Sequence, residues 1–199
     1  ASKPNPRWIA KPTVAYLWAR TVTCKNCRAT VPLLKTRWLC KKEKKRVVLT
    51  MEPNAEKTGV VFGIQNNASV KGGNPAQRRE HDKRIGAGTM SQAGARCPCC
   101  SAIITMDDIQ YAAVSGKWGD EVCAIIINGQ HGKEYISSTT VEARCYKSSL
   151  EAAASVEGQD PLDEPIDDTR PSPNARGLSG LTRYGINRFS RVFNFLCFF

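Results

Sequence analysis

The chain has 199 residues, of which 29 are Lys or Arg and 18 are Asp or Glu, giving a formal net charge of +11 and a pI of about 9.4. This length fits one ordinary domain with appendages, and a hydrophobic content of 41% permits one core. No stretch approaches the ~20 apolar residues of a membrane-spanning helix, and no apolar run follows residues 1–11, so we expect neither a membrane span nor a signal peptide. The basic excess lies in residues 1–100 and suits a polyanionic partner.

The front of the chain predicts strands on either side of a cysteine pair. Residues 1–13 are rich in Pro and Lys and predict an irregular segment. The β-branched and aromatic residues of 14–22 predict a strand that runs into Cys24, and residues 29–34 predict a short strand that leaves Cys27. Residues 46–51 predict a further strand, with 59–64 as its partner across a turn.

The middle of the chain changes from polar to apolar. Residues 65–95 show no periodic apolar face and predict a mobile basic loop, part of a long basic insert at 40–95 within a domain at 14–138. Residues 102–105 predict a short strand, and 106–114 predict a short helix capped by Asp107 and Asp108. The apolar residues 122–128 predict a strand, and the Asn128 and Gly129 turn signal predicts a hairpin that extends to residue 138.

The last part of the chain predicts one helix followed by irregular segments. Residues 139–156 place apolar side chains at loosely helical spacing. Residues 157–176 are acidic and contain Pro, which is typical of a linker. Residues 177–199 are expected to be the start of a following segment that is truncated.

Two Cys-x-x-Cys pairs, Cys24 with Cys27 and Cys97 with Cys100, carry the clearest chemistry. Two such pairs can complete a four-sulfur zinc shell. Residues 28–96 separate them, but closing a loop of that length costs only roughly 4 kcal/mol, whereas structural zinc contributes on the order of 10–16 kcal/mol in small peptides. We therefore expect a β-rich α+β fold, a zinc ribbon with short helices and flexible tails. Buried or disulfide-bonded cysteines are the alternative interpretation.

The remaining cysteines and the histidines predict no catalytic site. Cys99 could replace a neighbouring ligand, but its spacing is less suitable, and Cys40, Cys123 and Cys145 are expected to be free thiols. A cysteine nucleophile needs a positioned histidine, and the histidines, His81 and His131, lie in a charged loop and a turn. The odd number of nine cysteines argues against full disulfide pairing and favours a reducing cytoplasm.

Two basic runs lie inside the insert, and Trp38 precedes the first of them. Cations beside an aromatic ring can bind phosphate and stack on a base, so we expect contact with DNA, although solvated loops are the alternative. The expected nucleic-acid-binding residues are Arg37, Trp38, Lys41, Lys42, Lys44, Lys45, Arg46, Arg78, Arg79, Lys83 and Arg84.

Several sequence strings resemble the adenine-specific DNA methyltransferases that contain a zinc ribbon. They are Val-Ala-Tyr-Leu-Trp-Ala-Arg-Thr-Val at 14–22 running into the first cysteine pair, Val-Pro-Leu-Leu at 31–34, Trp-Leu at 38–39, Cys-Pro-x-Cys at 97–100, Gly-Lys-Trp-Gly at 116–119, the apolar segment at 122–127, Lys-Glu-Tyr at 133–135 and the segment at 177–190. The resemblance covers roughly residues 8–190. It implies structural zinc rather than iron.

The resemblance also implies a partial function. Such enzymes bind S-adenosylmethionine through a glycine-bearing motif and hold the target amine with an Asp/Asn-Pro-Pro-Tyr/Phe motif, and neither motif occurs in this sequence. Asp160 and Pro161 share two letters with the second motif but lack its aromatic residue. We expect the zinc-ribbon portion of such an enzyme, with the remainder of the methylase domain as a partner and S-adenosylmethionine bound only by the intact enzyme.

Two other classes of protein fit the same residues. One is a stand-alone zinc-ribbon adaptor that binds nucleic acid or a protein. The other is a rubredoxin-like iron module for electron transfer, because iron accepts the same four-sulfur geometry.

Overall fold

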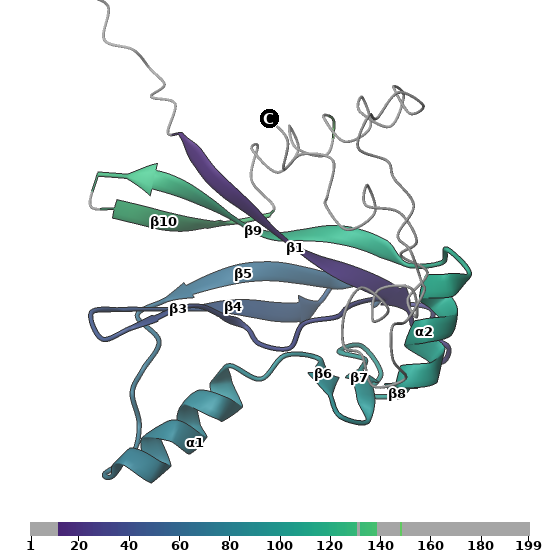
Figure 1. Cartoon of the computed structure of the whole chain (residues 1–199), viewed down its shortest axis with the longest axis horizontal. Helices are drawn as coiled ribbons and strands as arrows, with labels where there is room; N and C mark the ends of the chain where they lie inside the picture. Colours follow the sequence, from purple (N-terminus) through teal and green to yellow (C-terminus); the bar gives the residue numbers. More distant parts are fainter. Residues whose placement is uncertain (1–11, 131, 139–147, 149–199) are drawn as a thin grey trace, which may run out of the picture.

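The computed structural model describes residues 12–130, 132–138 and 148. In these ranges, two helices interrupt a series of strands (Figure 1). Their bounds are β1 Thr13–Thr23, β2 Thr30–Pro32, β3 Trp38–Lys42, β4 Lys45–Pro53, β5 Val60–Asn66, α1 Pro75–Ile85, β6 Met90–Ser91, β7 Gly94–Arg96, β8 Ile103–Thr105, α2 Met106–Val114, β9 Gly119–Gly129 and β10 Gly132–Ser137. The expectation of a β-rich fold with short helices is confirmed for this part of the chain.

The largest sheet has four antiparallel strands in the order β10-β9-β1-β2. Its centre is the apolar β9, which pairs with β1 on one side and β10 on the other, so that Ile125 lies opposite both Tyr16 and Ile136. The predicted strand at 14–22 and the predicted hairpin that begins at residue 122 are therefore confirmed. A central strand can form backbone hydrogen bonds on both of its edges and is shielded from water, so the most apolar segment of the chain is suited to this position.

A second sheet, β3-β4-β5, packs against one face of the first. Leu49 and Phe62 from the second sheet form a buried cluster with Ala19, Cys123 and Ala124 from the first sheet. The hydroxyl of Ser137 on β10 also donates to the Phe62 carbonyl oxygen at 2.7 Å. This layer is the main apolar support beneath β1, the strand that ends at the first cysteine pair (Figure 1).

A third, small sheet, β6-β7-β8, carries the second cysteine pair between β7 and β8. Its buried residues Ala95 and Ile104 join Val22 and Val31 of the first sheet and Ile109 of α2 in one cluster. The helix α2 begins after Thr105, whose side chain accepts from the Asp108 N–H, while the Asp108 carboxylate accepts from the Thr105 N–H. The predicted helix is confirmed, but Thr105 is its N-cap, because a reciprocal capping box satisfies two exposed donors at once.

The expectation of a mobile basic loop at 65–95 is wrong, because this segment contains α1, β6 and β7. Asn74 caps α1 by accepting from the Gln77 N–H, and Pro75 occupies its first turn. The helix buries His81 and Asp82 rather than an apolar stripe. Hydrophobic periodicity therefore could not indicate it.

The predicted helix at 139–156, the acidic linker at 157–176 and the segment at 177–199 lie outside the described residues, apart from Ser148, and nearly all of residues 1–13 do too. Neither α1 nor α2 is long and apolar enough to cross a membrane.

Candidate metal centre and basic surface

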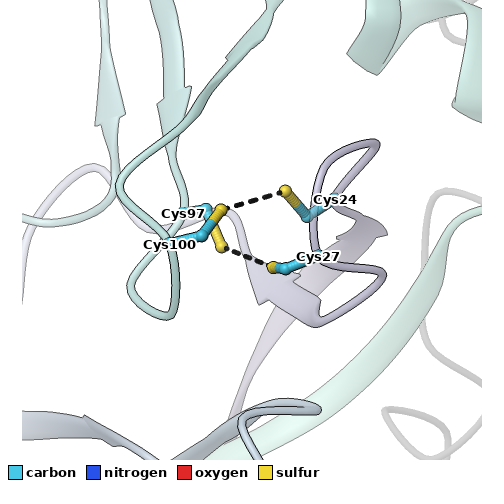
Figure 2. Close-up of side chains that lie close together, drawn as sticks. All are labelled: Cys24, Cys27, Cys97 and Cys100. Atoms are coloured by element: carbon cyan, nitrogen blue, oxygen red, sulfur yellow. Dashed lines mark hydrogen bonds between the residues drawn. The ribbon is translucent and has the colours of Figure 1, made fainter.

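The four predicted ligands meet at one point, although Cys24 and Cys27 follow β1 and Cys97 and Cys100 follow β7 (Figure 2). The Sγ atoms of Cys24 and Cys100 are 3.7 Å apart, and those of Cys27 and Cys97 are 3.6 Å apart. All four sulfur atoms lie within 4.8 Å of one another. A tetrahedral shell with metal–sulfur bonds of about 2.3 Å has sulfur–sulfur edges of about 3.8 Å. The arrangement is therefore compatible with a single tetrahedral metal ion.

Both cysteine pairs use the same backbone turn. The N–H of Cys24 donates to the Ala29 carbonyl oxygen at 2.8 Å, and the N–H of Arg28 donates to the Cys24 carbonyl oxygen at 3.0 Å. In the second turn, the N–H of Cys97 donates to Ala102 at 2.9 Å and that of Ser101 donates back to Cys97 at 2.9 Å.

The fifth residue of each turn has a positive φ, 64° at Arg28 and 62° at Ser101. Few non-glycine residues adopt this region, and those that do commonly lie in tight turns. Two turns with the same hydrogen bonds and the same unusual backbone angle thus present two pairs of thiols toward each other.

The two thiols of the second pair, Cys97 and Cys100, differ in their pKa values. Cys24 and Cys97 are 0% and 1% exposed, and they belong to the apolar cluster that contains Val31 and Ile104. Burial raises the pKa of Cys97 to about 12, whereas a side-chain hydrogen bond from Asn26 lowers the pKa of Cys100 to about 6. At neutral pH Cys100 is therefore a ready thiolate, and a metal ion would have to displace the proton of Cys97.

The other described cysteines lie outside the cluster. The Sγ atom of Cys99 contacts the Gly59 carbonyl oxygen at 3.4 Å, although Cys99 lies between two of the clustered residues in sequence. Cys123 is buried in the core and its pKa is raised to about 12 by burial, as expected for an inert thiol. Cys40, Cys99 and Cys123 are free, and so are the four clustered cysteines, whose closest sulfurs are far beyond a disulfide bond of about 2.05 Å. Cys145 lies outside the described residues.

Asp82 on α1 joins the two predicted basic runs. Its carboxylate pairs with Lys41 at 2.9 Å and also with Arg46. The hydrogen bond from Arg46, together with that from Lys41, lowers the pKa of Asp82. The Asp82 and Arg46 side chains are 11% and 13% exposed, so their pair is largely shielded from water, whereas the Lys41 side chain is 48% exposed.

Trp38 lies inside the same group. Its Nε1 donates to the Asp82 carbonyl oxygen at 3.0 Å, and the Arg46 guanidinium lies 4.7 Å and the Lys41 ammonium 5.6 Å from the ring centroid. The neighbouring Arg37 donates to the carbonyl oxygens of Ile85 and Ala87 just beyond the end of α1. These predicted nucleic-acid-binding residues thus hold α1 against the β3-β4-β5 sheet.

The other predicted basic residues are mostly at the surface. Exposed side chains are those of Lys42, Lys44, Arg78, Arg79, Lys83 and Arg84. Lys45 is half-buried and donates to the Lys133 carbonyl oxygen of β10. This contact places Lys133, which is exposed, beside the β3–β4 hairpin.

Sequence reasoning did not single out Asp82 or Lys133. An aspartate within a basic run, such as Asp82, indicates that an ion pair forms, but the sequence does not show which cation is its partner. Lys133 carries no signal of its own, because only the packing of β10 beside β5 brings it near the basic runs.

His81 has a structural role in this arrangement. It is buried, its Nε2 contacts the Ser69 carbonyl oxygen at 3.2 Å, and its Nδ1 lies 3.4 Å from the Arg84 guanidinium. Neither of these two contacts is with a nucleophile. His131 lies outside those residues.

Comparisons with protein-family models, with curated proteins and with solved structures gave no match.

Proposed function

We propose that Cys24, Cys27, Cys97 and Cys100 bind one zinc ion and that the surrounding strands form a zinc ribbon. The observation that carries this proposal is the convergence of four thiols on one point, with sulfur contacts of 3.6 and 3.7 Å. Four-thiolate shells are a usual type of structural zinc site. The matching backbone turns and the burial of two of the four thiols support the same conclusion.

The role of the metal in this proposal is structural. Four protein ligands fill a tetrahedral shell and leave no open position for water or substrate. The ion would join the end of β1 to the turn between β7 and β8, two segments that also meet in the apolar cluster around Val22 and Ile104. Such a site contributes directly to the free energy of folding.

The test is elemental analysis of the purified chain combined with thiol titration before and after chelation. We expect one zinc ion per chain and four thiols that become reactive together when the metal is removed. A chain that folds without metal, with all its surface thiols already reactive, would contradict the proposal.

Iron is the second candidate metal, because an iron centre uses the same four-sulfur geometry. Zinc is colourless, whereas iron bound to four thiolates gives a red protein. An absorption spectrum of the protein as purified, read beside the elemental analysis, separates the two metals.

We further infer that this zinc ribbon belongs to an S-adenosylmethionine-dependent adenine-specific DNA methyltransferase and contacts DNA. The strings that surround both cysteine pairs support this inference, and so does the excess of exposed cations near α1. The cofactor and the target base would be bound by the remainder of the methylase domain. A reducing compartment such as the cytoplasm would keep the zinc thiolates intact.

Methyl transfer by the full-length gene product tests this assignment. Incorporation of labelled methyl groups into adenine of duplex DNA is the expected result. A product that binds zinc and DNA but transfers no methyl group would support the alternative, a stand-alone zinc-ribbon adaptor.

A further inference from the structure

Two basic segments that lie far apart in the sequence form one surface in the fold. Residues 37–46 and 75–85 together contain ten Lys or Arg and three Asp or Glu. The Asp82 carboxylate of α1 binds both Lys41 of β3 and Arg46 of β4, so the helix is attached to the β3–β4 hairpin. In Figure 1, α1 lies beside this sheet as a separate element, and its residues 75–80, 83 and 84 are exposed.

The C-terminal part of the helix is held in position by polar contacts, and its first turn is stabilised by a cap. Asn74 caps its first turn, the Trp38 Nε1 binds the Asp82 carbonyl oxygen, and Arg37 binds two carbonyl oxygens at its end. Cations carried by a fixed element lose less side-chain and backbone freedom on binding than cations on a loop. The exposed cations of α1 are therefore presented in a defined array.

Other cations of the two segments are exposed and take no part in the ion pairs with Asp82. We define the basic ridge as Lys42, Lys44, Arg78, Arg79, Lys83, Arg84 and Lys133, all of which are exposed. The exposed carboxylates within the two segments, Glu43 and Glu80, only partly offset this charge. A surface of this sign attracts a polyanion.

The contacts of Trp38 with Arg46, Lys41 and α1 also cover the aromatic ring on which a base of single-stranded nucleic acid would stack. Proteins that bind single strands combine cations with exposed aromatic rings on which bases stack. Trp38 is the aromatic residue within the two basic segments, and its ring is approached by Arg46 and Lys41 while its Nε1 is bound to α1. Tyr135, two residues from Lys133 on β10, is half-buried, and the Lys45 ammonium lies 5.6 Å from its ring centroid. Both aromatic rings near the ridge are therefore covered by cations of the protein itself.

We propose that the basic ridge binds the phosphate backbone of duplex DNA, without base stacking and without sequence preference. This proposal rests on the proposed contact with DNA and specifies the form of DNA and the residues that bind it. Arg37, Trp38, Lys41 and Arg46 act as positioning residues that hold α1, and the exposed cations touch the phosphates. Binding by phosphate contacts alone has a dissociation constant of about 10⁻⁴–10⁻⁶ M at physiological salt.

The experiment compares a short random-sequence duplex with one of its own strands, by fluorescence anisotropy of the metal-loaded full chain, between about 50 and 200 mM salt. The test variant is Arg79→Gln with Lys83→Gln, which removes two exposed cations from α1. The matched control is Lys57→Gln with Lys117→Gln, which removes two exposed cations outside the ridge. Circular dichroism confirms that both variants fold.

We expect the natural sequence to bind the duplex more tightly than the single strand. The test variant should make the negative slope of log K against log salt shallower by about 2, since each phosphate contact contributes about −0.9 to it. The control should keep the original slope. Tighter binding of the single strand, or an equal loss in the control, would overturn the ridge proposal and leave the DNA contact standing. Failure to bind both the duplex and the single strand would overturn the ridge proposal and the proposed DNA contact together. The proposed zinc site would be unaffected, because the zinc content is measured separately.

Discussion

The metal centre and the α1 attachment hold together by opposite kinds of interaction. Around the cysteines, Val22, Val31, Ile104 and Ile109 form an apolar cluster that excludes water. At α1, the buried groups are polar, and Asp82 binds two cations while its backbone accepts from Trp38. The first region is stabilised by apolar contacts and, in the function proposed above, by a metal ion, whereas the second depends on the ionisation of Asp82.

This difference means that the two regions respond to different changes. Chelation removes charge compensation from four thiolates but leaves the Asp82 pairs in place. Acidification protonates Asp82 and weakens the attachment of α1. Acid also releases a bound metal ion by protonating the thiolates, but at a different pH, which depends on the pKa values of the thiols. Variants in each region can separate these effects.

The largest effect is expected for Cys100→Ser. Replacing a thiolate ligand should weaken zinc affinity by more than about 100-fold, because changes in residues that merely support a ligand already cost 10–100-fold. Competition with a chromogenic chelator measures this affinity. Cys99→Ser is the matched control, because the Cys99 thiol contacts Gly59 rather than the cluster, and it should retain the natural affinity. An equal loss in both variants would show that the assignment of ligands is wrong.

A smaller effect is expected for Asp82→Asn. This change removes the charged partner of Arg46 and Lys41, and it should lower the free energy of unfolding by about 2 kcal/mol, in the range of hydrogen bonds to charged groups. Urea unfolding monitored by Trp fluorescence measures the change, since Trp38 lies against Asp82. Zinc affinity should stay unchanged, and a parallel loss of zinc would mean that the two regions are not separable.

The pH dependence of stability tests the same pair. The Arg46 and Lys41 hydrogen bonds lower the pKa of Asp82, so its stabilising contribution is present above the unfolded-state pKa of about 3.9 and is lost as pH falls through the folded-state value. Unfolding measured from neutral pH down to acid should therefore show a steeper decrease for the natural sequence than for Asp82→Asn. Identical profiles would remove Asp82 from the explanation.

The smallest effect is expected for Thr105→Ala at the start of α2. Loss of the cap should lower the free energy of unfolding by about 1 kcal/mol. Because α2 packs on the cluster beside the cysteines, the loss should appear in the stability of the metal-centre region, measured by hydrogen exchange of β7 and β8. Exchange in α1 should not change. Thr58→Ala is the comparison variant, because it removes an exposed hydroxyl outside both helices that accepts one hydrogen bond, from Asn54 at 2.9 Å.

The sequence by itself determined which four cysteines lie together and where most strands form. A Cys-x-x-Cys turn is a local structure, so its residues can be identified without knowledge of the fold, and the apolar residues of β9 predict a buried central strand. The β-branched run before Cys24 predicted β1 for a similar reason.

Only the tertiary structure decided how the insert is arranged. The helix α1 has no apolar face, because it is attached through Asp82 and His81, so hydrophobic periodicity gave no sign of it. The pairing of Asp82 with Lys41 and Arg46, the placement of Trp38 against α1 and the approach of Lys133 to Lys45 all join segments distant in sequence. Charge and hydrogen-bond partners of this kind depend on three-dimensional proximity, whereas metal-ligand spacing and strand patterns are properties of the chain itself.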